Sequence, residues 1–318
     1  MLALKSRRNL QSKRFSSRRA MTICIAAACQ ENEQNDDPRI VFCCDWRGEV
    51  QQVGSADTTF KFRNLSEQWI ALQAGDVSRA EELCTRFETH LKTANFTDEN
   101  MADETRKVLN NYKRALADSY MQSTFGISFE DLIAKGREKL GDTFVETCLE
   151  QISRIKVNSQ LVIAGISEVY DYTEKRIVPS PVICVVDECQ DDPVVLETEF
   201  GVVGSGANAA KTMLFYREQE SSDPLMETIY SVYEAKTISE TVPGVGESLF
   251  LAVLYPDNTV LELSDAGYKR CLELFARFGP RTRDIKKRTE WFSFQSNYLE
   301  PIIPLKPSPP SPDPTLKP

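Results

Sequence analysis

A threonine near the start of the chain carries the groups that acyl transfer needs. Met21 precedes Thr22, and cleavage of the bond between them would leave an α-amine and a hydroxyl on one residue. An α-amine has an ordinary pKa of about 8, so it can take the hydroxyl proton near neutral pH during attack on a carbonyl carbon. A threonine that begins a β-strand is more often only a strand former. Thr22 therefore needs support from other residues.

Two charged residues and a glycine are candidates for that support. Lys61 alternates with Phe60 and Phe62, which predicts a strand with the lysine on the opposite face, either in solvent or in a cleft. In a cleft, its charge would favour ionisation of a nearby hydroxyl. Asp45 ends an apolar run and either makes a local turn contact or holds Lys61 by an ion pair. Gly75 precedes a predicted helix, either as a turn residue or as a backbone donor to an oxyanion.

The residue content argues against several other kinds of site. His90 is the only histidine, and its segment has helical periodicity, so we expect an exposed helix residue and no multi-histidine metal site. The nine cysteines include no C-x-x-C pair. We expect reduced thiols, with Cys43 and Cys44 in the core, and neither a metal nor an organic cofactor. Ser205 lies in a Gly-Ser-Gly turn before a helix, but this segment lacks the glycines of a phosphate-binding loop.

Charge and hydropathy argue against two classes of partner. The first 20 residues carry seven Lys or Arg and no acid, which leaves a net charge of about −16 on the remainder. A body this acidic does not attract nucleic acid through a general electrostatic field. No apolar run approaches the roughly 20 residues that span a bilayer. We expect no nucleic-acid partner, no membrane insertion and a cytoplasmic location.

Hydrophobic periodicity predicts segregated runs of strands and helices. The expected strands are 22–29, 39–44, 57–63, 69–74, 161–166, 182–186, 194–203, 249–254 and 259–263, the first two forming a hairpin with a long polar loop at 30–38. The expected helices are one opened by Ser78 in a capping box with Glu81, two or three within 99–156, and three more at 207–217, 224–239 and 266–280. This order favours an α+β domain, with helices packed on antiparallel sheets, over a regular βαβ alternation.

Composition divides the chain into a central domain and two flanking segments. Residues 1–21 are basic and rich in serine, and we interpret them as a leader, a propeptide or a misassigned start. Residues 22–265 form the predicted domain, with 99–156 as a helical insertion, and residues 266–300 form a C-terminal helical extension. Residues 301–318 contain eight prolines, which predicts a disordered tail.

The spacing of the candidate residues resembles that of the proteasome β-subunit and bacterial HslV-like family of N-terminal nucleophile hydrolases. Lys61 lies 16 residues after Asp45, and Gly75 lies 14 residues after Lys61, both as in the family pattern. Thr22 is separated from Asp45 by a longer stretch than in the family. The excess falls in the polar turn at 30–38, and loops tolerate such insertions.

The resemblance spans about residues 22–263. Residues 161–165 resemble the family's central strand, and residues 200–206 resemble the strand and turn that place a serine near the threonine. The implied fold is the four-layer αββα sandwich of the N-terminal nucleophile hydrolases. The implied catalytic residues are Thr22 as nucleophile, Lys61 and Asp45 as its activating pair, Gly75 as oxyanion donor and Ser205 as a supporting hydroxyl.

The sequence departs from the family pattern in three places. Met21 precedes Thr22, whereas precursors that process themselves usually have glycine there. The family's second acid, in an Asp-x-x-Ser-Gly segment, has a loose counterpart in Glu240, whose carboxylate lies one methylene further out. The helical region at 99–156 is longer than the compact members need.

Three functions fit these residues. The leading hypothesis is a threonine-type peptidase or amidase in protein catabolism, with a peptide or amide substrate. The resemblance also implies a homo-oligomer, with a ring as one form, and a possible ATPase partner. The alternatives are a non-catalytic, proteasome-like structural subunit and an amide hydrolase of the same fold that acts on a small molecule, since specificity depends on the pocket walls.

Overall fold

The computed structural model describes residues 22–32, 35–45, 61–94, 96–172, 175–243, 245–246, 248–280 and 297–302. Within these residues the chain is a mixed α+β structure with two antiparallel sheets and seven helices. The predictions for residues 1–21, for the first part of the strand expected at 57–63 and for most of the proline-rich tail lie outside the described residues.

The first sheet has six strands in the order β11-β10-β9-β2-β1-β8. These strands are β1 (Ile23–Asn32), β2 (Asn35–Cys44), β8 (Phe200–Gly204), β9 (Phe250–Leu254), β10 (Val260–Leu263) and β11 (Leu299–Pro301). Along β1, Ile23 and Ile25 face one apolar core while Cys24 and Ala26 face another. Because both faces of this central strand are buried, its sequence is a continuous apolar run rather than an alternating one.

The second sheet has five strands in the order β3-β4-β5-β6-β7. These strands are β3 (Phe62–Asn64), β4 (Trp69–Gly75), β5 (Ser159–Asp171), β6 (Arg176–Asp187) and β7 (Val194–Glu197). Trp69 on β4 pairs with Gly165 on β5, and a methyl group on that glycine would lie 2.4 Å from the Trp69 ring. The glycine thus makes room for the largest side chain of this core.

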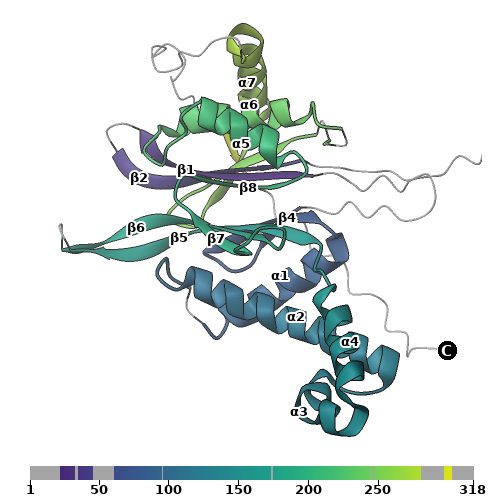
Figure 1. Cartoon of the computed structure of the whole chain (residues 1–318). Helices are drawn as coiled ribbons and strands as arrows, with labels where there is room; N and C mark the ends of the chain where they lie inside the picture. Colours follow the sequence, from purple (N-terminus) through teal and green to yellow (C-terminus); the bar gives the residue numbers. More distant parts are fainter. Residues whose placement is uncertain are drawn as a thin grey trace, which may run out of the picture.

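Helices cover the outer face of each sheet, and the two sheets face each other (Figure 1). Helices α5 (Ala207–Tyr216) and α6 (Leu225–Ser239) pack on the first sheet. Helices α1 (Val77–Leu91) and α2 (Met101–Phe125) pack on the second sheet. The core between the sheets includes the stacked rings of Phe42 and Phe62, whose centroids are 5.1 Å apart. Helix α7 (Asp265–Phe278) contributes Cys271 to the core of the first sheet.

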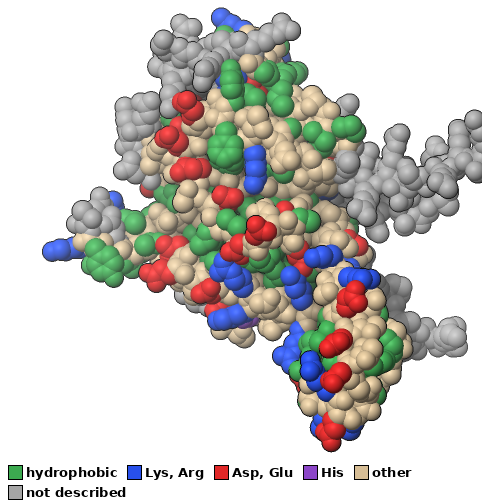
Figure 2. All heavy atoms as spheres, viewed as in Figure 1, with side chains coloured by type: hydrophobic (Ala, Val, Ile, Leu, Met, Phe, Trp, Pro, Cys, Tyr) green, Lys and Arg blue, Asp and Glu red, His purple; other side chains and the backbone are tan. Residues whose placement is uncertain are grey.

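The second part of the predicted helical insertion forms a separate lobe, whereas its first helix, α2, packs on the second sheet. Helices α3 (Phe129–Leu140) and α4 (Asp142–Ser153) share a small apolar core with the end of α2, centred on Met121, Leu132 and Val145. The lobe projects from the body at the lower right of Figure 1, and Figure 2 shows both acidic and basic side chains on its visible surface. Among the helices of the described residues, none combines the length and apolar character needed to cross a bilayer.

Strand pairing corrects three sequence predictions. The strand expected at 194–203 is two strands in different sheets, β7 and β8, because the polar residues 198–199 carry the chain from one sheet to the other. The long loop expected at 30–38 is short, because β1 and β2 continue to pair as far as Asn32 and Asn35. The extension expected to be helical as far as residue 300 ends in β11, which pairs with β10.

Two features of the first helices also differ from the predictions. The side chain of Asp76, not Ser78, caps α1, and it accepts a hydrogen bond from the Arg79 backbone N–H at 3.2 Å. A carboxylate directly before the helix satisfies a free N–H group better than a hydroxyl inside the first turn. His90 is only 27% exposed, because its ring lies 2.7 Å from the Glu104 carboxylate of α2.

Candidate active site

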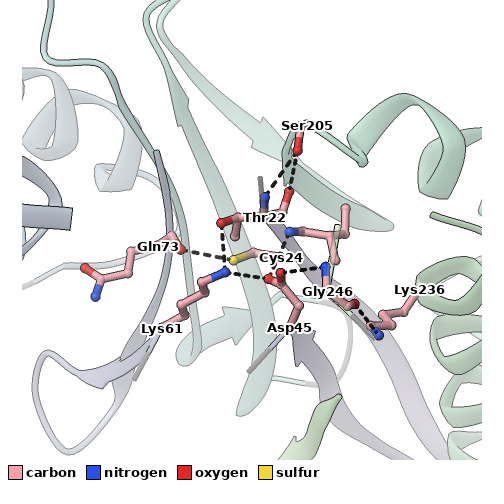
Figure 3. Close-up of polar contacts among 9 residues, drawn as sticks. Thr22, Cys24, Asp45, Lys61, Gln73, Ser205, Lys236 and Gly246 are labelled. Carbon is pink, nitrogen blue, oxygen red and sulfur yellow. Dashed lines mark hydrogen bonds and ion pairs between the residues drawn. The ribbon is translucent and has the colours of Figure 1, made fainter. Parts of the chain in front are cut away.

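Four of the five predicted site residues lie together at one end of the two sheets (Figure 3). Thr22 directly precedes β1, Asp45 directly follows β2, and Ser205 directly follows β8. Three of the residues therefore lie at the same end of neighbouring antiparallel strands of the first sheet. Lys61 directly precedes β3 and comes from the second sheet. The site therefore exists only where the two sheets face each other.

The Lys61 ammonium joins the hydroxyl of Thr22 to the carboxylate of Asp45. Its Nζ donates to Thr22 Oγ1 and to Asp45 Oδ1, both at 2.7 Å. The lysine side chain is 10% exposed and the Asp45 side chain is fully buried. In such a poorly solvated place, a positive charge at hydrogen-bond distance from Oγ1 stabilises negative charge on that oxygen more strongly than it would in water.

The Asp45 carboxylate is fixed by three donors on its two oxygens. Oδ1 accepts from the Ile23 backbone N–H at 3.1 Å as well as from Lys61, and Oδ2 accepts from the Gly246 backbone N–H at 3.3 Å. Antiparallel pairing of β1 and β2 places Asp45 beside the start of β1, where its own N–H donates to the Ile23 carbonyl at 3.2 Å. Asp45 thus makes the predicted ion pair and also a local backbone contact.

The Ser205 hydroxyl binds both backbone groups of Thr22. Its Oγ accepts from the Thr22 nitrogen at 3.2 Å and donates to the Thr22 carbonyl oxygen at 3.3 Å. Gly204, directly before it, has a φ of +101°, and a methyl group there would lie 2.1 Å from the same carbonyl oxygen. Only glycine allows the turn to bring the serine this close. The Gly204 N–H donates to the Gln160 side chain at 2.9 Å.

Gly75 is the one predicted site residue that the contacts do not join to the cluster. It ends β4 with a φ of +94°, and a methyl group there would lie 2.4 Å from the Asn158 carbonyl oxygen, so glycine is required for the turn. Among the hydrogen bonds of the described residues, none connects it to Thr22. Two residues earlier on the same strand, the Gln73 carbonyl accepts from the Cys24 thiol at 3.4 Å. Gly75 therefore lies on a strand that borders the site.

Two cysteines lie close to the cluster but do not compete as nucleophiles. Burial raises the pKa of the Cys24 thiol well above its ordinary value of 9.0. Burial, reinforced by the negative charge of Asp45, raises the pKa of Cys44 to about 12, although the nearby Lys61 ammonium opposes the rise. Because the thiolate is the reactive form, both sulfurs are unreactive near neutral pH. The Thr22 hydroxyl is the nucleophilic atom that the charges favour.

Sequence reasoning missed a second buried lysine at the site. Lys236, in the last turn of α6, is fully buried; its Nζ donates to the Gly246 carbonyl at 2.9 Å and pairs with Glu240. Figure 3 shows the chain of contacts that runs from Lys236 through Gly246 to Asp45. The only sequence signal was the spacing of Lys236 and Glu240, which are four residues apart and so lie on one helix face. The carboxylate of Glu240, the loose counterpart of the family's second acid, thus forms an ion pair with Lys236.

The cluster places a possible nucleophile, the Thr22 hydroxyl, beside a positive charge. The hydroxyl of Thr22 lies against an ammonium, the ammonium is held by a buried carboxylate, and the Thr22 nitrogen lies against the Ser205 hydroxyl. His90 is engaged with Glu104 on the helices and takes no part. A comparison with protein-family models matched no family, and a search of curated proteins found no match.

Proposed function

We propose that the chain is a threonine-type hydrolase of peptides or other amides, in which Thr22, freed at its nitrogen, is the nucleophile. The observation that carries this proposal is the position of Lys61, whose Nζ is 2.7 Å from both Thr22 Oγ1 and Asp45 Oδ1. A lysine whose only task was to balance a buried aspartate would not need to donate to a threonine hydroxyl as well. This geometry supports an activated Oγ1.

The proposal requires cleavage of the bond between Met21 and Thr22. In the intact chain the Thr22 nitrogen is a peptide nitrogen and the residue is 4% exposed. Cleavage turns this nitrogen into an amine that can act as a base. The Ser205 Oγ, 3.2 Å from the nitrogen, would then orient that amine.

The reaction is a two-step acyl transfer. Thr22 Oγ1 attacks the carbonyl carbon of the substrate amide while its proton moves to the Thr22 amine, and Lys61 stabilises the charge on Oγ1. The carbon–nitrogen bond then breaks, the leaving nitrogen takes that proton, and an ester to Thr22 remains. Water attacks the ester with the amine as base, Oγ1 regains a proton, and the carboxylic acid leaves. The Gly75 N–H is the proposed donor to the oxyanion.

The arrangement of layers supports the proteasome-like resemblance as part of this proposal. Two antiparallel sheets face each other with helices outside both, and the candidate residues lie at one end of the sheets. We propose that this is the four-layer αββα sandwich of the N-terminal nucleophile hydrolases. Assembly of copies into a ring, an ATPase partner and a cytoplasmic location, in keeping with nine free thiols, belong to the same proposal.

The test is the identity of the mature N-terminus and the site of acylation. We would purify the native protein, determine its first residue by intact mass and N-terminal sequencing, and treat it with a peptide β-lactone. The expected result is a chain that begins at Thr22 and carries one acyl group there. Thr22→Ser should retain labelling because it keeps the hydroxyl, and Thr22→Ala should lose it. A mature chain that begins upstream of Thr22 would rule out the mechanism.

A second function is supported by the burial of the intact site. If Met21 stays attached, Thr22 remains a peptide-bonded, 4% exposed residue, and the same contacts only tie the two sheets together. The chain would then be a non-catalytic structural relative. Absence of labelling on a chain shown to begin at Thr22 would also favour this function.

A further inference from the structure

Lys236 is a charged residue in a place where a charge is costly. Its side chain is fully buried at the end of α6, and removing an ammonium from water is strongly unfavourable unless it is well paired. Its carboxylate partner, Glu240, lies one helical turn further on and is 25% exposed. The pair with this partly exposed carboxylate does not by itself explain why a lysine, rather than an apolar residue, is buried here. The second contact of the ammonium, with Gly246, supplies a reason.

That second contact holds a loop at the site. Lys236 Nζ donates to the Gly246 carbonyl oxygen at 2.9 Å. On the preceding side, the Val245 N–H donates to the Val242 carbonyl at 3.2 Å, and Val245 is buried in the core of the first sheet. The loop is therefore anchored by apolar packing before Gly246 and by an ammonium on the Gly246 carbonyl itself.

Gly246 connects this anchored loop to Asp45. Its N–H donates to Asp45 Oδ2 at 3.3 Å, while Lys61 and the Ile23 N–H share Oδ1. Without the Gly246 donor, Oδ2 would lose its described partner and the fully buried carboxylate could rotate about its last bond. Rotation of Asp45 would move the point at which Lys61 is held, and with it the contact of Nζ with Oγ1.

We propose that Lys236 is a positioning residue of this site: by holding the Gly246 carbonyl it keeps the Gly246 N–H on Asp45, and Asp45 in turn holds Lys61 against Thr22. Glu240 balances the charge of Lys236 and so acts on the site through it. The effect on catalysis rests on the proposed function, whereas the effect on the geometry does not.

The competing explanation is that Lys236 only stabilises the fold. The same helix offers a matched control, because Glu234 of α6 is fully buried in an ion pair with Arg217 and has no described contact with the cluster around Asp45. Glu234→Gln weakens a buried pair on α6 and leaves the chain from Lys236 to Asp45 intact. It should lower stability without changing the chemistry of folded molecules.

The experiment measures acylation of the mature chain by a peptide β-lactone as the maximal rate, kinact, and the half-saturating concentration, KI. The variants are Lys236→Met, the double variant Lys236→Met with Glu240→Met, and Glu234→Gln. The double variant leaves no unpaired carboxylate and keeps the experiment decisive if the single variant fails to fold. We expect kinact to fall about 10- to 100-fold in both Lys236 variants with KI unchanged, because a misplacement of about 1 Å can cost that much. Glu234→Gln should keep the wild-type kinact.

Each result decides the proposal. If the double variant is folded and keeps kinact within about twofold of wild type, Lys236 is structural only. If wild type itself is not acylated, the proposed function fails, and a crystal structure of the double variant still decides the geometric part of the inference. The inference then predicts that Gly246 N has left Asp45 Oδ2 and that Lys61 Nζ has left Thr22 Oγ1. Retention of both contacts would overturn it.

Discussion

Replacing Lys61 by methionine isolates the contribution of one charge to the reactivity of Thr22. Methionine keeps most of the length and apolar stem of lysine but removes the ammonium that lies 2.7 Å from Oγ1. The expected result is slower acylation of Thr22 without loss of the nucleophile itself.

The magnitude follows from the distances. At an effective dielectric constant of about 20, a full negative charge on Oγ1 at 2.7 Å from the ammonium is stabilised by about 6 kcal/mol. Asp45 Oδ1 lies at the same distance from the ammonium, so it is at most twice as far from Oγ1, and its repulsion cancels at least half of this energy. Lys61 and Asp45 together therefore contribute at most about 3 kcal/mol, so removing both charges should slow acylation by on the order of 100-fold. Lys61→Met alone leaves the repulsion of Asp45 in place and removes up to about 6 kcal/mol, so its loss of rate should be larger, up to on the order of 10⁴-fold.

The assay is the time course of Thr22 acylation by a peptide β-lactone, followed by intact mass on the mature chain. Lys61→Met leaves Asp45 as an unpaired, fully buried charge, which typically costs about 3–5 kcal/mol of stability. Urea unfolding should therefore accompany each rate, so that the rate is expressed per folded molecule. The double variant Lys61→Met with Asp45→Asn removes this charge as well, so it should show a smaller loss of rate, on the order of 100-fold, and a smaller loss of stability.

Two outcomes would refute this reasoning. Acylation within about twofold of wild type in both variants would show that Lys61 only balances Asp45 and does not act on Oγ1. A loss greater than about 10⁴-fold in the double variant would exceed what the two screened charges supply and would show that Lys61 is itself the base that takes the proton.

Three further predictions concern the fold. Cys189 is the exposed cysteine, whereas the other eight are buried, so a thiol reagent at pH 8 should modify one thiol per native chain. Because burial raises the pKa of Cys44 from 9.0 to about 12, its contribution to stability is complete below pH 9 and is lost as the pH rises toward 12, which should lower the urea midpoint across that window. Asp76→Ala should lower the free energy of unfolding by about 1 kcal/mol through loss of the α1 cap, whereas Ser78→Ala should leave the urea midpoint nearly unchanged.

The elements that the sequence predicted best are those with an unambiguous hydrophobic pattern. The first hairpin, the strands that contain Trp69 and Leu161, and the helices after Ser205 all lie where periodicity placed them. The three helices between 99 and 156 also match the prediction. In each case a clear run or period of apolar residues marks the element along the chain.

The misplaced boundaries have a common physical cause. Residues 194–203 form a nearly continuous stretch of strand-forming residues, and a local pattern does not show that the chain changes sheets at its polar middle. The pairing of Asn32 with Asn35 likewise depends on the strands that precede and follow it, because polar residues carry little strand signal of their own.

The residues around Thr22 were predictable from the sequence, whereas the residue that supports them, Lys236, was not. Asp45 and Lys61 were recognisable because their separation resembles the family pattern, because Asp45 ends an apolar run and because Lys61 alternates with two phenylalanines. Lys236 has no such signal, since a lysine near the end of a helix usually lies in solvent. Its buried ammonium donates to the Gly246 carbonyl, ten residues further along the chain, and no local pattern shows that contact.

The division of the site between distant parts of the chain bears on when a nascent chain becomes reactive. The Thr22 nitrogen and its partner Ser205 are 183 residues apart, and Asp45 and Gly246 are 201 residues apart. A polypeptide still on the ribosome has all of the early residues but lacks their late partners until almost the whole domain has been synthesised. Under the proposed function, an unfinished or half-folded molecule would therefore lack the contacts that activate Thr22 and would not hydrolyse other chains during its own biosynthesis.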